Sequence, residues 1–187
     1  MTGQKNRFST TEKLWDLDDK QLKTPKHDAL VLWFMDNWSK YISFEDELPH
    51  FRFNDEIMVF NTSEVKSEFP VMSSPTFLAG YVDIVIIGKY VLTKEDWSRL
   101  KKTRVVKSSW CDTKIEHYIE VKPYIDSFGA VLRQINSYKR FKSDNGEWYL
   151  FTLDNRFDSH FESQGIKVLH PPADFDIVKV KKYYGLV

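Results

Sequence analysis

The sequence lacks the features that several common protein classes need. Cys111 is the only cysteine among 187 residues, which excludes an internal disulfide and a zinc site built from several thiolates. No apolar run approaches the roughly 20 residues of a membrane-spanning helix, and the polar N-terminus lacks the apolar centre of a signal peptide. No glycine-rich phosphate loop is present, which argues against an ATPase or a dinucleotide enzyme. We therefore expect an intracellular, cytoplasmic protein without membrane contact.

An excess of charge of one sign is also lacking. Lys and Arg total 27 and Asp and Glu total 27, so the net charge is zero and a general polycation that coats nucleic acid is excluded. Any basic surface must therefore be local. Apolar residues make up 42% and aromatic residues 16% of the chain, enough to build a hydrophobic core. The five histidines show no pair with the spacing of zinc ligands.

Hydrophobic periodicity predicts one α/β domain over residues 24–187, preceded by a polar arm at residues 1–23. Thr24 and Pro25 are typical of a helix start, and that helix is expected to reach Tyr41. A second helix is expected to begin at Asp126 or Ser127 and to end near Phe141. Strands are predicted at 51–53, 57–60, 68–72, 76–87, 115–122, 148–153 and 166–169, with a solvated edge strand at 179–184. This order indicates a mixed central β-sheet flanked by helices.

Residues 89–114 carry a local positive charge and form a predicted insertion between two core strands. This segment contains eight basic residues and three acidic residues. The sequence Thr93-Lys94-Glu95-Asp96 resembles a capping box and predicts a short helix to about Lys101. If this segment emerges beside the candidate site described below, its basic surface would neutralise the phosphates of a nucleic acid. The alternative interpretation of the basic segment is a helix face exposed to solvent. The candidate nucleic-acid-binding residues are Lys94, Arg99, Lys101, Lys102, Arg104 and Lys107.

Three charged residues on two predicted strands form the candidate site. Asp83 lies within an otherwise apolar strand, where an unpaired carboxylate would be costly to bury. Glu120 and Lys122 are two residues apart, so they project from the same face of the next strand. If the two strands are neighbours, both carboxylates can approach one Mg²⁺ or Mn²⁺ ion, and Lys122 can orient a water or stabilise charge on a phosphate. A purely structural salt-bridge cluster is the alternative.

The following helix adds Gln134 and Tyr138, which are four residues apart and share a face. Together, the segments Gly80–Asp83, Ile119–Lys122 and Leu132–Tyr138 resemble the PD-(D/E)XK nuclease superfamily, over roughly residues 25–170. The Pro-Asp pair that names the superfamily is absent, since Val82 precedes Asp83, and the interval between Asp83 and Glu120 is longer than in the simplest family pattern.

The resemblance implies a restriction-endonuclease-like core and a role for each matching residue. Asp83 and Glu120 would be metal ligands, together with the backbone carbonyl of Val121. Lys122 would be the water-orienting base or charge stabiliser, and Gln134 would lie beside the site. Asp28, on the first helix, is the candidate for a further acidic ligand, although stabilisation of the helix dipole also explains it. Its neighbour His27 is expected at the surface, with the mouth of the site as an alternative.

The function expected from this resemblance is Mg²⁺- or Mn²⁺-dependent hydrolysis of DNA phosphodiester bonds, with RNA as an alternative substrate. The alternative function is a catalytically silent module of the same fold that binds DNA or assists assembly. Because cutting both strands of a duplex usually needs two active sites, a homodimer is an open alternative. His117 is expected in the core or an interface, on the face opposite Glu120.

Overall fold

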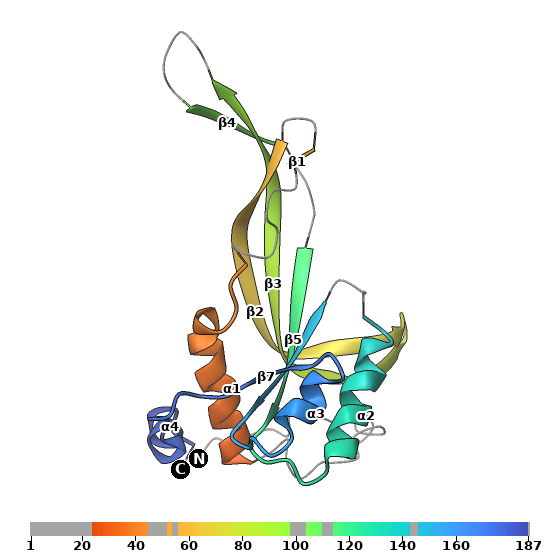
Figure 1. Cartoon of the computed structure of the whole chain (residues 1–187), viewed down its shortest axis with the longest axis vertical. Helices are drawn as coiled ribbons and strands as arrows, with labels where there is room; N and C mark the ends of the chain where they lie inside the picture. Colours follow the sequence, from red (N-terminus) through yellow and green to blue (C-terminus); the bar gives the residue numbers. More distant parts are fainter. Residues whose placement is uncertain are drawn as a thin grey trace.

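The computed structural model describes residues 24–44, 52–53, 56–97, 104–109, 114–142 and 146–186. In these parts the chain is an α/β protein with one mixed, open sheet and helices on both faces (Figure 1). The predicted mixed sheet flanked by helices is therefore confirmed. The predicted polar arm at residues 1–23 lies outside the described residues. None of the described helices is long and apolar enough to cross a membrane.

Seven strands in the described residues form one sheet, with the order β1-β2-β3-β5-β6-β7 and with β4 also paired to β3. Strands β5, β6 and β7 run parallel, and the remaining neighbours are antiparallel. The strands predicted between residues 51 and 169 coincide with these elements to within one residue at their ends among the described residues, with two exceptions. The strands predicted at 57–60 and 68–72 are parts of one longer strand, β2, and β3 continues beyond the predicted 76–87 to Trp97. Their bounds are Arg52–Phe53 (β1), Glu56–Ser74 (β2), Phe77–Trp97 (β3), Arg104–Ser109 (β4), Lys114–Lys122 (β5), Glu147–Thr152 (β6) and Lys167–Leu169 (β7).

Side-chain caps begin the two main helices where the sequence predicts them. In α1 (Pro25–Asn37) the Thr24 hydroxyl accepts a hydrogen bond from the backbone N–H of His27 at 3.2 Å. In α2 (Phe128–Lys139) the Ser127 hydroxyl accepts one from Ala130 N–H at 3.4 Å. Both helices end slightly earlier than expected, α1 because a 3₁₀ turn, Trp38–Lys40, follows it. The remaining helices are α3 (Asp158–Glu162) and α4 (Ile177–Tyr183).

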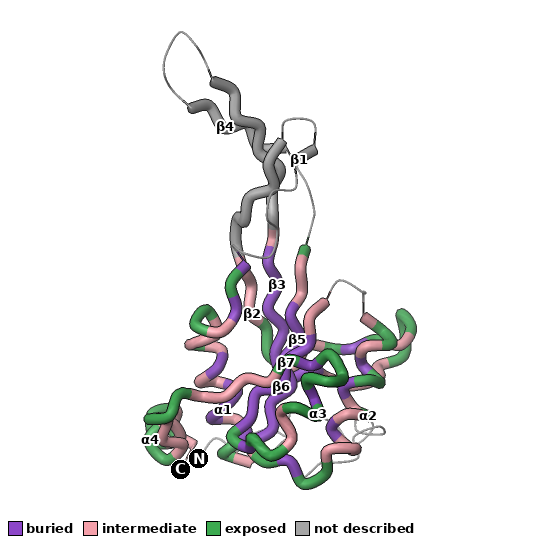
Figure 2. The backbone as a smooth tube through the Cα atoms, viewed as in Figure 1, coloured by how far each residue is buried: buried purple, intermediate pink, exposed green. Residues whose placement is uncertain are grey.

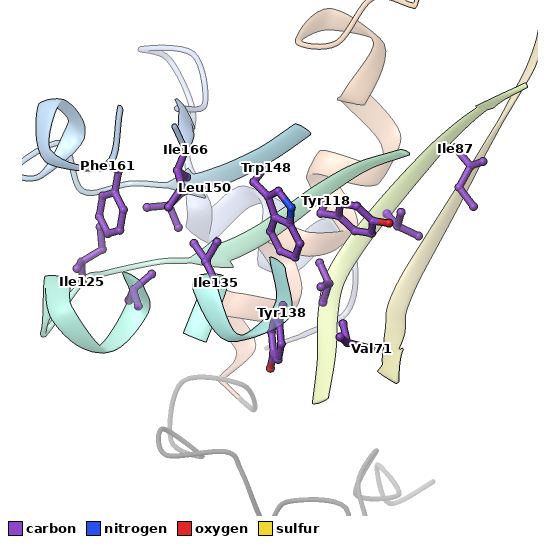
Figure 3. Close-up of a cluster of buried hydrophobic side chains, with 13 residues drawn as sticks. Val71, Ile87, Tyr118, Ile125, Ile135, Tyr138, Trp148, Leu150, Phe161 and Ile166 are labelled. Carbon is purple, nitrogen blue, oxygen red and sulfur yellow. The ribbon is translucent and has the colours of Figure 1, made fainter. Parts of the chain in front are cut away.

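The core lies on both faces of the sheet, because side chains alternate along β3 and β5. Ile84, Ile86 and Ile119 pack with α1 on one face. Val85 and Tyr118 pack with α2 on the other face, where Figure 3 shows Tyr118 in one cluster with Ile135 and Tyr138 of α2. Among the residues whose burial is described, Figure 2 shows the buried segments of β3, β5 and β6 between α1 and α2. The two helices thus cover opposite faces and hold β3 and β5 between them.

Strands β2 and β3 continue well beyond the body as a long arm (Figure 1). The helix predicted from Thr93 to about Lys101 is wrong over residues 93–97, which belong to β3. Thr93 is paired with Ile57 of β2 and with Ser108 of β4. Pairing with strands on both sides satisfies the main chain and overrides the local capping signal.

The C-terminal segment also differs from its prediction. Residues expected as an edge strand form α4, because the Asp176 carboxylate caps the helix by accepting hydrogen bonds from Val178 N–H at 2.9 Å and Lys179 N–H at 3.3 Å. The signal for this helix in the sequence is Asp176, a favourable N-cap residue immediately before residues 177–183. The alternation of basic and apolar residues in that segment favoured a strand instead.

His117 of β5 is buried, as predicted, and its ring lies 4.8 Å from that of Phe44 and 5.5 Å from that of Tyr149. Burial lowers the pKa of His117 from 6.5 to about 4, although nearby Glu147 opposes the shift. The folded protein therefore keeps this imidazole neutral at a pH where the unfolded chain binds a proton.

We expect the free energy of unfolding to be independent of His117 above pH 6.5 and to fall by up to roughly 3 kcal/mol between pH 6.5 and 4, because the unfolded state binds the extra proton. Urea denaturation across this range measures the slope. His117→Phe keeps an aromatic ring and should flatten the slope, whereas His160→Gln, at an exposed position, should leave it intact. Identical slopes for wild type and His117→Phe would contradict this assignment.

Candidate functional site

The register of β3 and β5 brings the two candidate carboxylates together. The paired positions run from Lys89 opposite Lys114 to Ile84 opposite Ile119. Asp83 and Glu120 are the residues next to this last pair on the two strands, and the Asp83 charge acts on the Glu120 carboxyl group. The convergence that the sequence made conditional on strand adjacency is therefore present.

Asp83 is almost fully buried, and its carboxylate contacts both β5 and α1. Its Oδ2 accepts a hydrogen bond from the backbone N–H of Val121 at 2.8 Å, and its Oδ1 lies 3.2 Å from Nε2 of His27. Burial alone would raise the pKa of Asp83, but the His27 and Lys122 charges and the Val121 N–H outweigh it and lower the pKa. Asp83 is therefore the ionised carboxylate of the site.

Glu120 is fully buried and has a different environment. Its Oε1 lies 3.0 Å from Nζ of Lys122, itself buried, and accepts a hydrogen bond from Nε2 of Gln134 at 2.9 Å. Its Oε2 is buried and has no hydrogen-bond partner. Burial and the neighbouring Asp83 charge raise the pKa of Glu120 to about 7, with Lys122 opposing the shift. The two carboxylates therefore differ in proton affinity although they lie on neighbouring strands.

Gln134 reaches Glu120 because Tyr138 packs closely against β3. The Gln134 side-chain amide also donates to the Tyr138 hydroxyl at 3.4 Å. A Cβ atom at Gly80 would lie 2.5 Å from that hydroxyl oxygen and 2.8 Å from a ring carbon. The absence of a side chain at Gly80 thus allows the contact between α2 and β3 that orients Gln134 towards Glu120.

His27 is the site residue whose position the sequence did not predict. Instead of lying at the surface it is buried, with Nε2 beside Asp83 and Nδ1 at 3.4 Å from Oδ1 of Asp28. The Nε2 contact is not aligned as a hydrogen bond. Burial lowers the pKa of His27, but Asp83 and Asp28 raise it overall to about 9, so the imidazole is protonated at neutral pH. Its position at the third residue of a helix capped by Thr24 was the available signal.

Of the other predicted site residues, Asp28 and Val121 lie at the site, whereas the described basic residues lie away from it. Asp28 is held by its contact with His27, and Val121 donates its N–H to Asp83. Arg99, Lys101 and Lys102 lie outside the described residues. Lys94, Arg104 and Lys107 occupy the arm, at paired positions far along β3 and β4. The expectation that the basic segment emerges beside the site is therefore wrong for these three, because β3 continues straight into the arm.

A strained residue marks the place where β3 separates from β5. Ser67 pairs with Ile84 and Phe69 with Val82, which leaves Glu68 opposite Asp83. Glu68 has φ 53°, a left-handed conformation that costs a residue with a side chain about 1–2 kcal/mol. The strained Glu68 therefore lies opposite Asp83, whose carboxylate accepts the hydrogen bond from the Val121 N–H.

The donor set fits a divalent cation that keeps several of its waters. Within the described part of the chain no three His, Cys, Asp or Glu side chains are grouped as a complete metal site. Mg²⁺, however, is commonly held by one or two carboxylates with water in the remaining positions. Asp83 is ionised, and the buried Oε2 of Glu120 lacks a partner that a cation would supply. The residues therefore fit Mg²⁺ better than a fully protein-coordinated metal such as structural zinc.

Comparisons with protein-family models, with curated proteins and with solved structures gave no match. The resemblance to the PD-(D/E)XK superfamily therefore stays a prediction from the sequence.

We expect Gly80→Ala to destabilise the protein by about 1–3 kcal/mol, because the new methyl group overlaps the Tyr138 ring. Gly129→Ala is the matched control: it lies in α2, its Cβ would meet nothing closer than 3.4 Å, and it should stabilise by about 0.5–1 kcal/mol. Chemical denaturation measures both. Because Tyr138→Leu makes room for the methyl group, the double variant should lose less than the two single variants together; full additivity would contradict the contact.

Proposed function

We propose that this protein is a metal-dependent nuclease of the PD-(D/E)XK type that hydrolyses phosphodiester bonds of DNA. The observation that carries the proposal is that Asp83 and Glu120 lie on neighbouring strands, close enough for the charge of one to act on the other, with the Lys122 ammonium 3.0 Å from Glu120. Two carboxylates and an ammonium on neighbouring strands supply the cation ligands and the positive charge that phosphodiester hydrolysis needs. Gln134 on α2 adds a donor that fixes Glu120.

In this proposal the side chains of the protein position a cation, a water and a positive charge around the phosphate, and no side chain forms a covalent intermediate. Asp83 and Glu120 would hold Mg²⁺ or Mn²⁺, which when bound polarises a phosphate oxygen and acidifies water. Val121 N–H and His27 fix the Asp83 carboxylate, and Gln134 fixes that of Glu120. Lys122 orients the attacking water and stabilises the negative charge that grows on the phosphate.

A catalytically silent, DNA-binding or assembly module is the second candidate. The observation that favours it is the internal compensation of charge: His27 faces Asp83, and Lys122 faces Glu120, both in the interior. The charges of such a cluster compensate one another without a metal, although Oε2 of Glu120 keeps no hydrogen-bond partner. The two candidates differ in what happens when metal and nucleic acid are added.

Glu120→Gln and Lys122→Met should each reduce cleavage of labelled single-stranded, double-stranded or branched DNA in Mg²⁺ or Mn²⁺ by at least about 10²-fold, since the first removes a proposed ligand of the cation and the second removes the charge proposed to stabilise the reacting phosphate. The matched controls are Glu147→Gln and Lys167→Met, which break an exposed Glu–Lys ion pair of 2.6 Å on the neighbouring strands. These controls should retain cleavage.

Either single variant leaves a buried charge without its partner, so folding must be checked by circular dichroism. The double variant Glu120→Gln/Lys122→Met removes both charges together and should fold even where a single variant is unstable. A folded, inactive double variant beside an active wild type supports the proposal. A wild type that binds DNA but cuts none of these substrates favours the silent module.

Metal should also stabilise the folded protein. At a Mg²⁺ or Mn²⁺ concentration one hundred times its dissociation constant, binding to the native state alone adds about 2.7 kcal/mol, a rise in Tm of roughly 5–10 °C for a chain of this size. Differential scanning calorimetry with and without chelator measures the rise. Asp83→Asn should abolish it and Glu147→Gln should not. An unchanged wild-type Tm at all metal concentrations would support the purely structural cluster.

A further inference from the structure

The segments that follow β5 and β6 leave the sheet at the same edge, next to the candidate site. Lys122, the last residue of β5, is paired with Thr152, the last residue of β6, and the two strands are parallel. Tyr124 comes two residues after Lys122, so the chain between their Cα atoms spans at most about 7 Å. Residues 123–127 and 153–157 therefore begin beside the strand end that contains Glu120 and Lys122.

A network of hydrogen bonds fixes these two segments to each other. The buried Asp154 carboxylate accepts hydrogen bonds from Ile125 N–H at 3.1 Å and from Nε and Nη2 of Arg156 at 2.8 and 2.6 Å. Nη2 of Arg156 also donates to the Ile125 carbonyl at 2.9 Å. Pairing of a guanidinium with both oxygens of a carboxylate sets direction as well as distance. The Arg156 guanidinium is thus held in one orientation, although 48% of its side chain is exposed.

The fixed guanidinium joins a column of planar groups that starts at the core. Its central carbon lies 4.4 Å from the ring centre of Tyr124 and 5.2 Å from that of Phe157. The Phe157 ring is stacked with that of Phe128, the first residue of α2, with centres 6.0 Å apart. Phe128 and Phe157 both pack against the hydrophobic core. The column therefore runs from the core through Arg156 to Tyr124.

Tyr124 is the outer end of this column, and 52% of its surface is exposed. The hydrogen bonds of Asp154 and Arg156 join the two segments without using the Tyr124 ring. A cation over one part of a half-exposed ring holds that ring in place by a cation–π contact. Because the ring is already ordered, stacking of a further planar group on it costs little side-chain entropy.

An unpaired nucleobase is the planar group that suits this surface in the proposed function. Paired bases in a duplex present only their edges in the grooves. Unpaired bases expose their faces, and proteins bind them by stacking on aromatic rings and guanidinium planes. Such stacking accepts any base, since every base has an aromatic face.

We propose that Tyr124, supported by Arg156, is a stacking site for an unpaired base of a DNA strand. The inference rests on the proposed function and narrows its substrate to DNA that contains an unpaired nucleotide, as in single-stranded or branched DNA. Binding at this site involves the exposed ring and does not need access to the buried carboxylates.

The test measures binding with chelator present, so that no cleavage occurs, by fluorescence anisotropy of labelled DNA. The probes are a single strand of about 12 nucleotides, the blunt duplex of the same sequence, and an abasic strand of the same length that keeps the phosphates but has no bases. The wild type should bind the single strand most tightly. Tyr124→Ser should weaken that binding about 5- to 100-fold, the range expected for one stacked base, and should leave the affinity for the abasic strand unchanged.

Two further variants separate stacking from other effects. Tyr124→Trp keeps an aromatic face and should retain binding of the single strand. Tyr183→Ser removes a tyrosine of α4 that is 80% exposed, and it should bind all three probes as the wild type does. All variants should fold, because the substituted side chains are exposed, and circular dichroism checks this.

Equal binding of the single strand by wild type and Tyr124→Ser, or equal wild-type affinity for the base-containing and abasic strands, would overturn the inference. If the wild type in that case cuts DNA in Mg²⁺ and Glu120→Gln does not, the proposed nuclease function stands without the stacking site. If binding depends on Tyr124 but no DNA is cut, the stacking site stands and belongs to the silent module. A wild type that neither binds nor cuts any DNA contradicts both proposals.

Discussion

The structure depends on mutual compensation of buried charge among Asp83, Glu120, His27 and Lys122. Each of these side chains would be costly to bury alone, and removal of one partner from such a cluster typically costs 3–5 kcal/mol. The compensation links α1, which supplies His27, to β3 and β5. Helix α2 is joined to the same cluster through Gln134. Four elements, α1, β3, β5 and α2, are therefore fixed relative to one another at this point.

The cluster of Asp83, Glu120, His27 and Lys122 is physically consistent with both proposed functions, a nuclease and a catalytically silent module. A buried ion pair is weak evidence of stabilisation, because hydrophobic residues of similar volume often replace it without loss. Its presence therefore suggests a use other than stability. Glu120 retains a buried oxygen without a partner and a pKa near 7, so the cluster is compensated but not saturated. A carboxylate left in this state is suited to accept a cation, which supports the nuclease proposal.

Strand β3 connects two features that the sequence presented as separate. Its inner half contributes Asp83 to the buried cluster, and its outer half forms the centre of the arm. At the end of the β3–β5 pairing that lies away from the arm, Glu68 adopts a left-handed conformation opposite Asp83. Strain of this kind persists only where surrounding structure enforces it. The continuity of β3 means that the separation between site and basic arm is set by strand length, which varies far less than the reach of a loop.

The sequence by itself determined the mixed α/β class, the caps at Thr24 and Ser127, the buried His117 and the shared face of Glu120 and Lys122, because each leaves a local signal with a fixed period or a fixed spacing. The approach of Asp83 to Glu120 was predicted only on the condition that β3 and β5 are neighbours, which the tertiary structure decided. Tertiary structure alone decided the burial of His27 beside Asp83, the contact of Gly80 with Tyr138, the strand at residues 93–97 and the distance of Lys94 from the site. These outcomes depend on pairing and packing between segments that are far apart in the chain. Local patterns carry no record of such contacts, because several partners can satisfy the same polar or apolar surface.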